Sequence, residues 1–263
     1  MRFMDNIRQR QPIIYAIVII LVFLMLHKIV GGVVESITNF PYYYQKAFHE
    51  FITVLIAVVM MFFSNTYKQV LKTQASIGET LKVSAFELCM TVLIFTTCIA
   101  ENLHNELRPL NDIIIFLIYF LLVGIVEEVI FRGIIENILL ERYGTDYKGV
   151  LISVFVSGGL FGMAHLSNFS LETSLSGVVI QSLQCIGIGI YYGAIYARTH
   201  NIYGLIFLHA ISDIAAVADS GLWGIGTVES SITDLGLLNI FSVIIYLIPT
   251  IYILRKERVM ENL

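Results

Sequence analysis

Long apolar stretches alternate with short polar links along the whole chain. Several of them reach or exceed the roughly 20 apolar residues that a helix needs to cross a bilayer. The pattern predicts membrane helices over about 12–34, 49–63, 83–100, 112–140, 150–165, 178–197, 202–217 and 235–254. The run 112–140 is longer than one bilayer thickness, so this helix must tilt or project beyond the membrane. The predicted fold is therefore all-α, a polytopic membrane bundle of about eight transmembrane helices.

The polar links are too short to divide the chain, so we expect residues 1–263 to form a single integral membrane domain. The link 35–48 is expected outside the membrane, with tyrosines at 42–44 that are typical of an interfacial aromatic belt. The stretch 218–234 is expected to be a loop. In the helix over 178–197, Gly189, Gly193 and Ala197 recur every four residues, a spacing that lets membrane helices approach closely.

Composition agrees with this pattern, because 57% of residues are hydrophobic, 14% are charged and the mean hydropathy is +0.81. The chain has no block of basic residues that would indicate binding to nucleic acid. Its three cysteines lie in apolar runs, so we expect no disulfide framework. With the N-terminus in the cytoplasm, the outer side carries only Lys28, Lys46 and Arg108. The inner side then carries Arg2, Arg8, Arg10, Lys68, Lys72, Lys82, Arg142, Lys148, Arg198, Arg255, Lys256 and Arg258. The positive-inside rule therefore predicts that both termini are cytoplasmic.

The stretch GIVEEVIFRGIIENILL, residues 124–140, places four charged side chains, those of Glu127, Glu128, Arg132 and Glu136, inside an apolar run. Charges at membrane depth are costly and usually mark a site. Glu128 and Arg132 are four residues apart, so they share a helix face and can pair. Glu127 lies about 100° around the helix from Glu128 and must find its partners on other helices. We expect the pair to hold the helix in place and Glu127 to be free for chemistry.

Two further apolar helices carry polar groups at the same spacing. In FGMAH, Phe161 and His165 share a face, so the aromatic ring can wall one side of the imidazole. In HAISD, Asp213 either accepts a hydrogen bond from His209 and fixes its tautomer, or both side chains point at a shared site. Each of these groups would be costly to bury alone. We therefore expect Glu127, His165, His209 and Asp213 to converge in one wet cavity.

These residue types suit the hydrolysis of a peptide bond without a covalent intermediate. Glu127 and His165 suit general-base activation of a water molecule. His209 and Asp213 suit binding of the carbonyl oxygen as negative charge develops on it. Spacing alone also allows zinc, held by His165, His209 and a carboxylate with a water in the open position. The chain has no H-E-x-x-H motif.

The three elements resemble a known family. EEVIFR at 127–132, FGMAH at 161–165 and HAISD at 209–213 are similar to the EExxxR, FxxxH and HxxxN/D motifs of the CPBP (Abi) intramembrane proteases. This group includes the type II CAAX prenyl endopeptidases, and the resemblance covers roughly residues 110–220. It implies an eight-helix bundle with an intramembrane cavity, and glutamate-dependent hydrolysis that requires no metal, although the family has also been described as metalloproteases.

By position in these motifs, the resemblance assigns water activation to Glu127 and His165, and the oxyanion site to His209 and Asp213. Glu128 and Arg132 would be the supporting part of the first motif, as Phe161 would be of the second. Eukaryotic CAAX enzymes have Asn where this chain has Asp213. An ionised aspartate would repel an oxyanion, so Asp213 would have to be protonated or would serve only to orient His209.

The resemblance also implies a membrane-associated peptide or protein as substrate. Bacterial members are associated with bacteriocin self-immunity and with the export or maturation of peptide signals, so we expect a protein of the bacterial cell membrane. Two other readings stay open. The first is a non-catalytic immunity or scaffold protein that binds a partner through the same fold. The second is a transporter or channel that uses the intramembrane charges, against which the chain shows no internal repeat.

The remaining polar residues of the apolar runs receive simpler interpretations. Glu87 is expected near enough to the membrane surface to reach water. His27, His49, His104 and His200 are expected at helix ends or in links, where water can solvate them.

Overall fold

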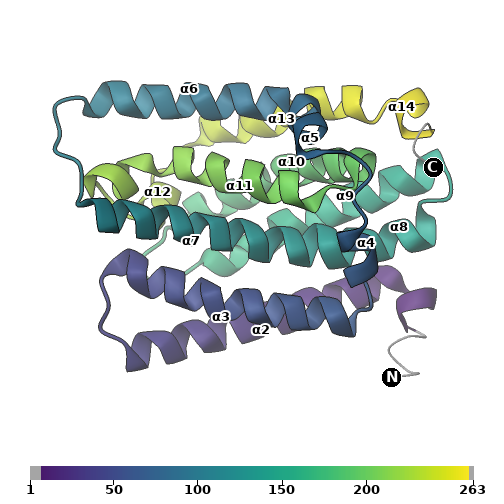
Figure 1. The fold of residues 1–263 in the computed structure, drawn as a ribbon, viewed down its shortest axis with the longest axis horizontal. Coiled ribbons are helices and arrows are strands. Elements are labelled where there is room, and N and C mark those ends of the chain that lie inside the picture. Colours follow the sequence, from purple (N-terminus) through teal and green to yellow (C-terminus); the bar gives the residue numbers. More distant parts are fainter. Residues whose placement is uncertain (1–6, 261–263) are drawn as a thin grey trace.

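The structure, a computed structural model, describes residues 7–260, so Arg2 of the predicted cytoplasmic side lies outside the described residues. Those residues fold into a bundle of helices (Figure 1). The long helices are α2 (Pro12–Ile37), α3 (Tyr42–Phe63), α6 (Ala85–Asn102), α7 (Leu110–Glu128), α9 (Tyr147–Ala164), α10 (Leu175–Thr199), α11 (Ile202–Ala216) and α13 (Ser242–Ile253). The short segments are α4 (Tyr67–Leu71), α5 (Ile77–Val83), η1 (Val129–Glu136), α8 (Asn137–Tyr143), η2 (His165–Asn168), η3 (Asp219–Trp223), α12 (Val228–Thr233), η4 (Leu237–Phe241) and α14 (Lys256–Met260).

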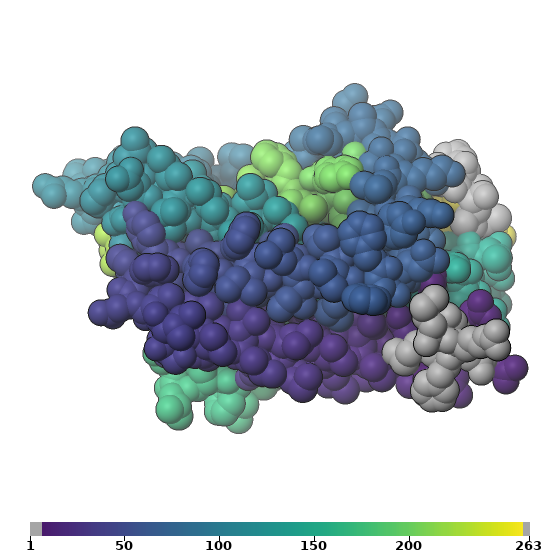
Figure 2. All heavy atoms as spheres, turned by 60° about the horizontal axis from the view of Figure 1, so that its bottom comes forward, coloured from purple at the N-terminus to yellow at the C-terminus, as the bar shows by residue number. Residues whose placement is uncertain are grey.

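Six helical runs of the described chain are long and apolar enough to cross a membrane, and two shorter apolar runs, Ile202–Ala216 and Leu237–Ile253, accompany them. The predicted all-α membrane bundle is therefore confirmed. Its outer faces are apolar: Leu21 and Met25 of α2, and Phe51 and Leu55 of α3, are each more than half exposed. Figure 2 shows α2 and α3 lying side by side along one face of the molecule. Such a surface is suited to lipid rather than to water.

The polar links contain more helix than the sequence pattern predicts. The predicted link 35–48 is wrong over its second half, because α3 already begins at Tyr42. The predicted loop 218–234 contains η3 and α12. The long run predicted over 112–140 is instead continuous from Leu110 to Tyr143 and changes to a π-helix over η1. The Thr227 side chain caps α12, whereas α3 and α7 begin after Pro41 and Pro109 without a side-chain cap, so periodicity of apolar residues alone does not mark these helix starts.

Helices α9 and α10 pack closely through small residues. A methyl group placed on Gly189 would come within 2.9 Å of the Gly158 carbonyl oxygen on α9. One placed on Gly193 would come within 2.9 Å of Glu136 Oε2. The close approach of helices predicted from the small-residue spacing on α10 is thus confirmed at Gly189, whereas Gly193 makes room for the Glu136 side chain.

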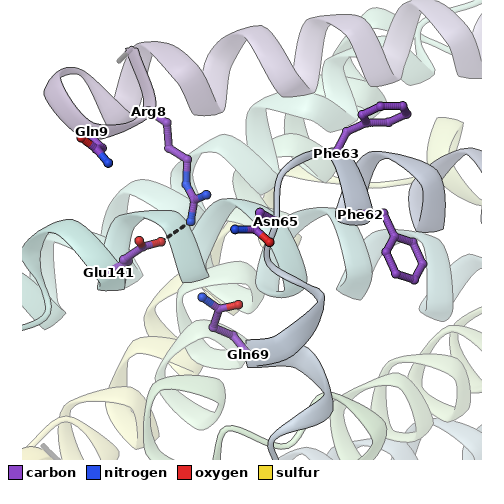
Figure 3. Close-up of a pocket in the computed structure, with 7 residues that line it drawn as sticks. All are labelled: Arg8, Gln9, Phe62, Phe63, Asn65, Gln69 and Glu141. Atoms are coloured by element: carbon purple, nitrogen blue, oxygen red, sulfur yellow. Dashed lines mark hydrogen bonds and ion pairs between the residues drawn. The ribbon is translucent and has the colours of Figure 1, made fainter. Parts of the chain in front are cut away.

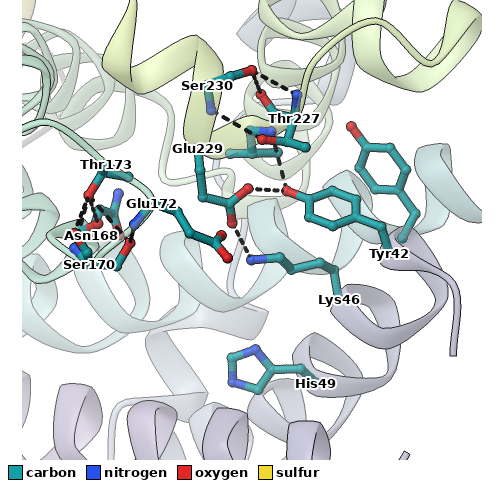
Figure 4. A network of polar contacts seen from close by, with 12 residues as sticks. Tyr42, Lys46, His49, Asn168, Ser170, Glu172, Thr173, Thr227, Glu229 and Ser230 are labelled. Carbon is teal, nitrogen blue, oxygen red and sulfur yellow. Dashed lines mark hydrogen bonds and ion pairs between the residues drawn. The ribbon is translucent and has the colours of Figure 1, made fainter. Parts of the chain in front are cut away.

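A polar network joins the start of α3 to α12 at one end of the bundle (Figure 4). Glu229 Oε2 accepts a hydrogen bond from the Tyr42 hydroxyl at 2.5 Å, and its Oε1 accepts one from Lys46 Nζ at 2.6 Å. Burial by itself would raise the pKa of the Glu229 carboxyl, but the Lys46 ammonium and these hydrogen bonds outweigh it and hold that pKa below its ordinary value. Glu229 is therefore ionised and clamps the two helices together.

Glu87 does not reach water, so that expectation is wrong. Its side chain on α6 is buried, with 1% of the residue exposed. Its Oε1 accepts a hydrogen bond from Ser212 Oγ at 2.6 Å and a longer one from the Tyr192 hydroxyl at 3.4 Å. The carboxyl thus binds α6 to α10 and α11, because a buried polar group needs partners in the protein.

Candidate intramembrane active site

The charged stretch lies at the junction of α7 and η1, in the middle of the bundle (Figure 1). Glu128 and Arg132 are fully buried, and Arg132 Nη1 donates to Glu128 Oε1 at 3.0 Å. All eight residues of the π-helix η1 are buried. Short π-helical segments often occur at functional sites, because they redirect side chains that an α-helix would place elsewhere. The pairing predicted from the four-residue spacing is present.

Arg132 connects this junction to two other helices. Its Nη2 donates to the backbone carbonyl of Gly189 on α10 at 2.9 Å. Its guanidinium lies over the Phe161 ring of α9, 4.8 Å from the ring centroid. A side chain on Gly189 would meet Gly158 and Phe161 of α9, so this glycine lets α10 approach α9 at the level of the arginine. Arg132 and Phe161 therefore form part of the scaffold beneath the site, which fits the supporting position that the resemblance gives them.

His209 of α11 lies among three carboxyl groups. Its Nδ1 lies 2.7 Å from Glu128 Oε1, and Glu128 therefore fixes the orientation of the ring. Its Nε2 faces Glu127 Oε2 at 3.4 Å and Asp213 Oδ2 at 3.5 Å. Of the two arrangements left open for His209 and Asp213, the contacts match the shared site. Glu127 finds its partner on another helix, as its position on α7 requires.

His165 begins the short 3₁₀ segment at the end of α9. Its Nδ1 lies 2.9 Å from the Phe161 backbone carbonyl, so this nitrogen carries the proton and Nε2 is left to face other groups. The Phe161 ring contacts the imidazole edge-on, with the ring centroids 4.8 Å apart. The predicted wall of the imidazole is present.

Glu127 and His165 line one cavity of about 70 Å³. Since a cavity needs only about 10–15 Å³ to hold a water molecule, this space can hold water beside both side chains. One oxygen of Glu127 is fully shielded and has no hydrogen-bond partner among the described residues. Neither His209 nor Asp213 lines this cavity. Glu127 therefore stands between the two halves of the predicted site, with His165 on its cavity side and His209 on the other.

Two ionisable residues that line the same cavity were not among the predicted site residues. His27 of α2 and Glu50 of α3 line it opposite the family motifs. The expectation that His27 and His49 lie at helix ends is wrong, because both lie within long helices and approach each other, with ring centroids 4.3 Å apart. The sequence did carry a signal for these residues, because His27 and the adjacent pair His49 and Glu50 are polar residues within apolar runs.

A larger cavity of about 650 Å³ lies away from these residues, where the first turn of the described chain meets α8 (Figure 3). Arg8 pairs with Glu141 at its edge. None of the predicted site residues lines it. Volume alone therefore does not identify the site, whereas the gathering of ionisable groups in a small buried space does.

The predicted zinc ligands His165 and His209 are not part of a ligand cluster. Over residues 7–260, one set of three histidine, cysteine or carboxyl side chains brings its ligand atoms within 4.8 Å of one another, and it consists of His27, His49 and Glu50. We therefore derive no step through a metal held by His165 and His209. Whether the reaction requires a cofactor stays a prediction.

Residues 109–215 match the family model described as Type II CAAX prenyl endopeptidase Rce1-like. The matched segment begins at the start of α7 and ends within α11, so it contains all four predicted catalytic residues and their supporting contacts. It leaves out α2 and α3, which supply the other side of the cavity. No curated protein and no solved structure matches the chain.

Proposed function

Because residues 109–215 of this integral membrane protein match the model of type II CAAX prenyl endopeptidases, we propose that it is a glutamate-type intramembrane endopeptidase. It cuts a peptide bond of a membrane-associated peptide or protein. The observation that carries this proposal is the position of Glu127, which shares a small cavity with His165 and lies 3.4 Å from His209. The base Glu127, a cavity that can hold water and the hydrogen-bond donor His209 are thus adjacent.

In this mechanism a water molecule in the cavity lies between Glu127 and His165. The Glu127 carboxylate accepts a proton from the water as the oxygen attacks the carbonyl carbon, and later returns it to the leaving amine. The acceptor for that proton is Glu127 Oε1, because Oε2 is fully shielded and faces His209 Nε2 at 3.4 Å. His165 holds the water through Nε2, because its Nδ1 is committed to the Phe161 carbonyl.

His209 supplies the positive charge. Both of its ring nitrogens face carboxyl oxygens, at 2.7 Å from Glu128 and 3.4 Å from Glu127, so the contacts favour the doubly protonated imidazolium. Its Nε2–H can then donate to the oxyanion of the tetrahedral intermediate. Asp213, at 3.5 Å from Nε2, balances the charge of this cation and need not contact the oxyanion. An aspartate at this position is therefore compatible with the reaction.

The substrate is a peptide or protein that reaches the site from the lipid bilayer. We place the protein in the bacterial cell membrane with both termini in the cytoplasm, which the distribution of basic residues supports. Its biological role would be bacteriocin self-immunity or the maturation of a peptide signal. The non-catalytic immunity or scaffold protein remains the alternative.

The test is cleavage of a library of hydrophobic peptides by protein reconstituted in liposomes. Glu127→Gln and His165→Ala should each abolish cleavage while the protein still inserts and elutes as the parent does. Glu106→Gln and His104→Ala, which change exposed residues of the same types, should cleave normally. Turnover retained in Glu127→Gln would refute the assignment of the base. A library left intact by the parent and all variants would favour the partner-binding alternative.

A further inference from the structure

A second cluster of ionisable side chains lies on α2 and α3, outside the segment that matches the family model. His27 Nε2 lies 3.1 Å from Glu50 Oε1, and His49 Nδ1 lies 3.6 Å from the same oxygen. Glu50 is buried, with 7% of the residue exposed. Two imidazoles and one carboxylate on two membrane helices are a costly arrangement unless they bind something or one another.

The tautomer of His49 makes the cluster informative. Its Nε2 lies 3.0 Å from the backbone carbonyl of His27, and a carbonyl oxygen can only accept, so Nε2 carries the proton. In the neutral ring, Nδ1 then points a lone pair toward the Glu50 carboxylate oxygen. Two lone pairs facing each other in a buried site repel, so a cation between them would stabilise the cluster. That cation is either a proton on Nδ1 or a metal ion.

The same hydrogen bond is typical of metal-binding histidines. Such a histidine usually donates its second ring N–H to a carbonyl or carboxylate, which fixes the tautomer and aims the free nitrogen at the ion. The His27 carbonyl serves this purpose for His49. The first histidine of the cluster thus supports the second through its own backbone.

The spacing of the donors fits a metal of known geometry. Ligands about 2.0–2.1 Å from a tetrahedral zinc ion lie about 3.3 Å from one another. The two nitrogen-to-oxygen separations, 3.1 Å and 3.6 Å, lie on either side of that value. All three donor atoms lie within 4.8 Å of one another. A small movement of the His49 ring would complete three corners of a tetrahedron.

The fourth corner has room for water. His27 and Glu50 line the cavity of about 70 Å³ that also contains Glu127 and His165. Two histidines and one glutamate with an open water position form a common zinc ligand set. Imidazole and carboxylate donors exclude soft ions that require thiolates.

We propose that His27, His49 and Glu50 bind one zinc ion on the wall of the cavity opposite Glu127 and His165. The site is separate from the family motifs, and it does not depend on the proposed hydrolysis. Because the zinc ion would share the cavity with Glu127 and His165, its positive charge would also change the electrostatic potential that a substrate meets there.

The experiment measures zinc directly. Full-length protein without a polyhistidine tag is purified in detergent, stripped with a chelator, dialysed against zinc, and its bound metal is counted by mass spectrometry. The parent should bind one zinc per chain. His27→Ala, His49→Ala and Glu50→Gln should each weaken binding at least about tenfold. The control His104→Ala, an exposed histidine, should bind zinc as the parent does.

Two further measurements separate the possible outcomes. Cobalt substituted for zinc should give the visible absorption of a tetrahedral ion in the parent, and Glu50→Gln should change or remove that spectrum even where it retains some metal. Glu127→Gln and His209→Ala should keep zinc binding. Zinc lost in those two variants instead would place the ligands in the candidate active site and overturn the proposal. A parent that binds no zinc would mean that a proton holds the cluster together, which would also overturn it.

Discussion

Replacement of Arg132 by methionine is the sharpest test of the structural half of the site. Arg132 is fully buried and donates to Glu128 Oε1 and to the Gly189 carbonyl. Methionine keeps the unbranched shape but removes the charge and all donors. Glu128 would then remain buried with only His209 as a partner.

The magnitude follows from these contacts. Removal of one partner of a buried ion pair costs about 3–5 kcal/mol, because the other charge is left without compensation. The stacking on Phe161 is worth up to about 2 kcal/mol when desolvated, and it overlaps with the first contribution rather than adding to it. We therefore expect Arg132→Met to lower the free energy of unfolding by about 3–5 kcal/mol. Arg142→Met, an exposed arginine ten residues further along the same continuous helical run, should leave it nearly unchanged.

The assay is reversible unfolding in mixed micelles, followed by helical circular dichroism and by the single tryptophan, Trp223. The double variant Arg132→Met with Glu128→Leu removes the uncompensated carboxylate. It should be more stable than Arg132→Met alone, although His209 then loses its Nδ1 acceptor at a cost of about 1–3 kcal/mol. A loss below about 1 kcal/mol for Arg132→Met, or strictly additive losses in the double variant, would refute the reasoning, because contacting residues are expected to couple.

Three other outcomes follow from the contacts. Gly158→Ala should cost about 1–3 kcal/mol of unfolding free energy, because its methyl group would lie 2.4 Å from a backbone nitrogen of α10, whereas Gly159→Ala meets nothing within 4 Å and should be tolerated. The pKa of Glu229 is below its ordinary value of 4.5, so its contribution to stability is complete above pH 4.5 and is lost as the pH falls through the folded-state pKa. Thermal unfolding across this pH range should show a loss of stability in the parent that is absent in Glu229→Gln. Glu128→Gln should lower kcat as well as stability, because it weakens the hydrogen bond that orients His209; a normal kcat in a folded variant would contradict this.

The fold class and the location of the charged site are both predictable from the amino-acid sequence. Apolar length predicts membrane helices because unsatisfied backbone groups are intolerable in lipid. Charges inside such helices single out Glu127, Glu128 and Arg132 for the same energetic reason. The Glu128–Arg132 pair was also predictable, since a spacing of four residues is a local property of the helix and survives even in the π-helical segment.

Which helices face each other depends on the packing of the whole bundle. The orienting partner of His209 is Glu128, 81 residues away, rather than the nearby Asp213. Glu87 is buried because α10 and α11 bring hydroxyl groups to it. His27 meets Glu50 only because α2 and α3 pack side by side. Periodicity states which face of a helix is polar, but contacts between faces depend on packing over long sequence separations, and no local pattern encodes that packing.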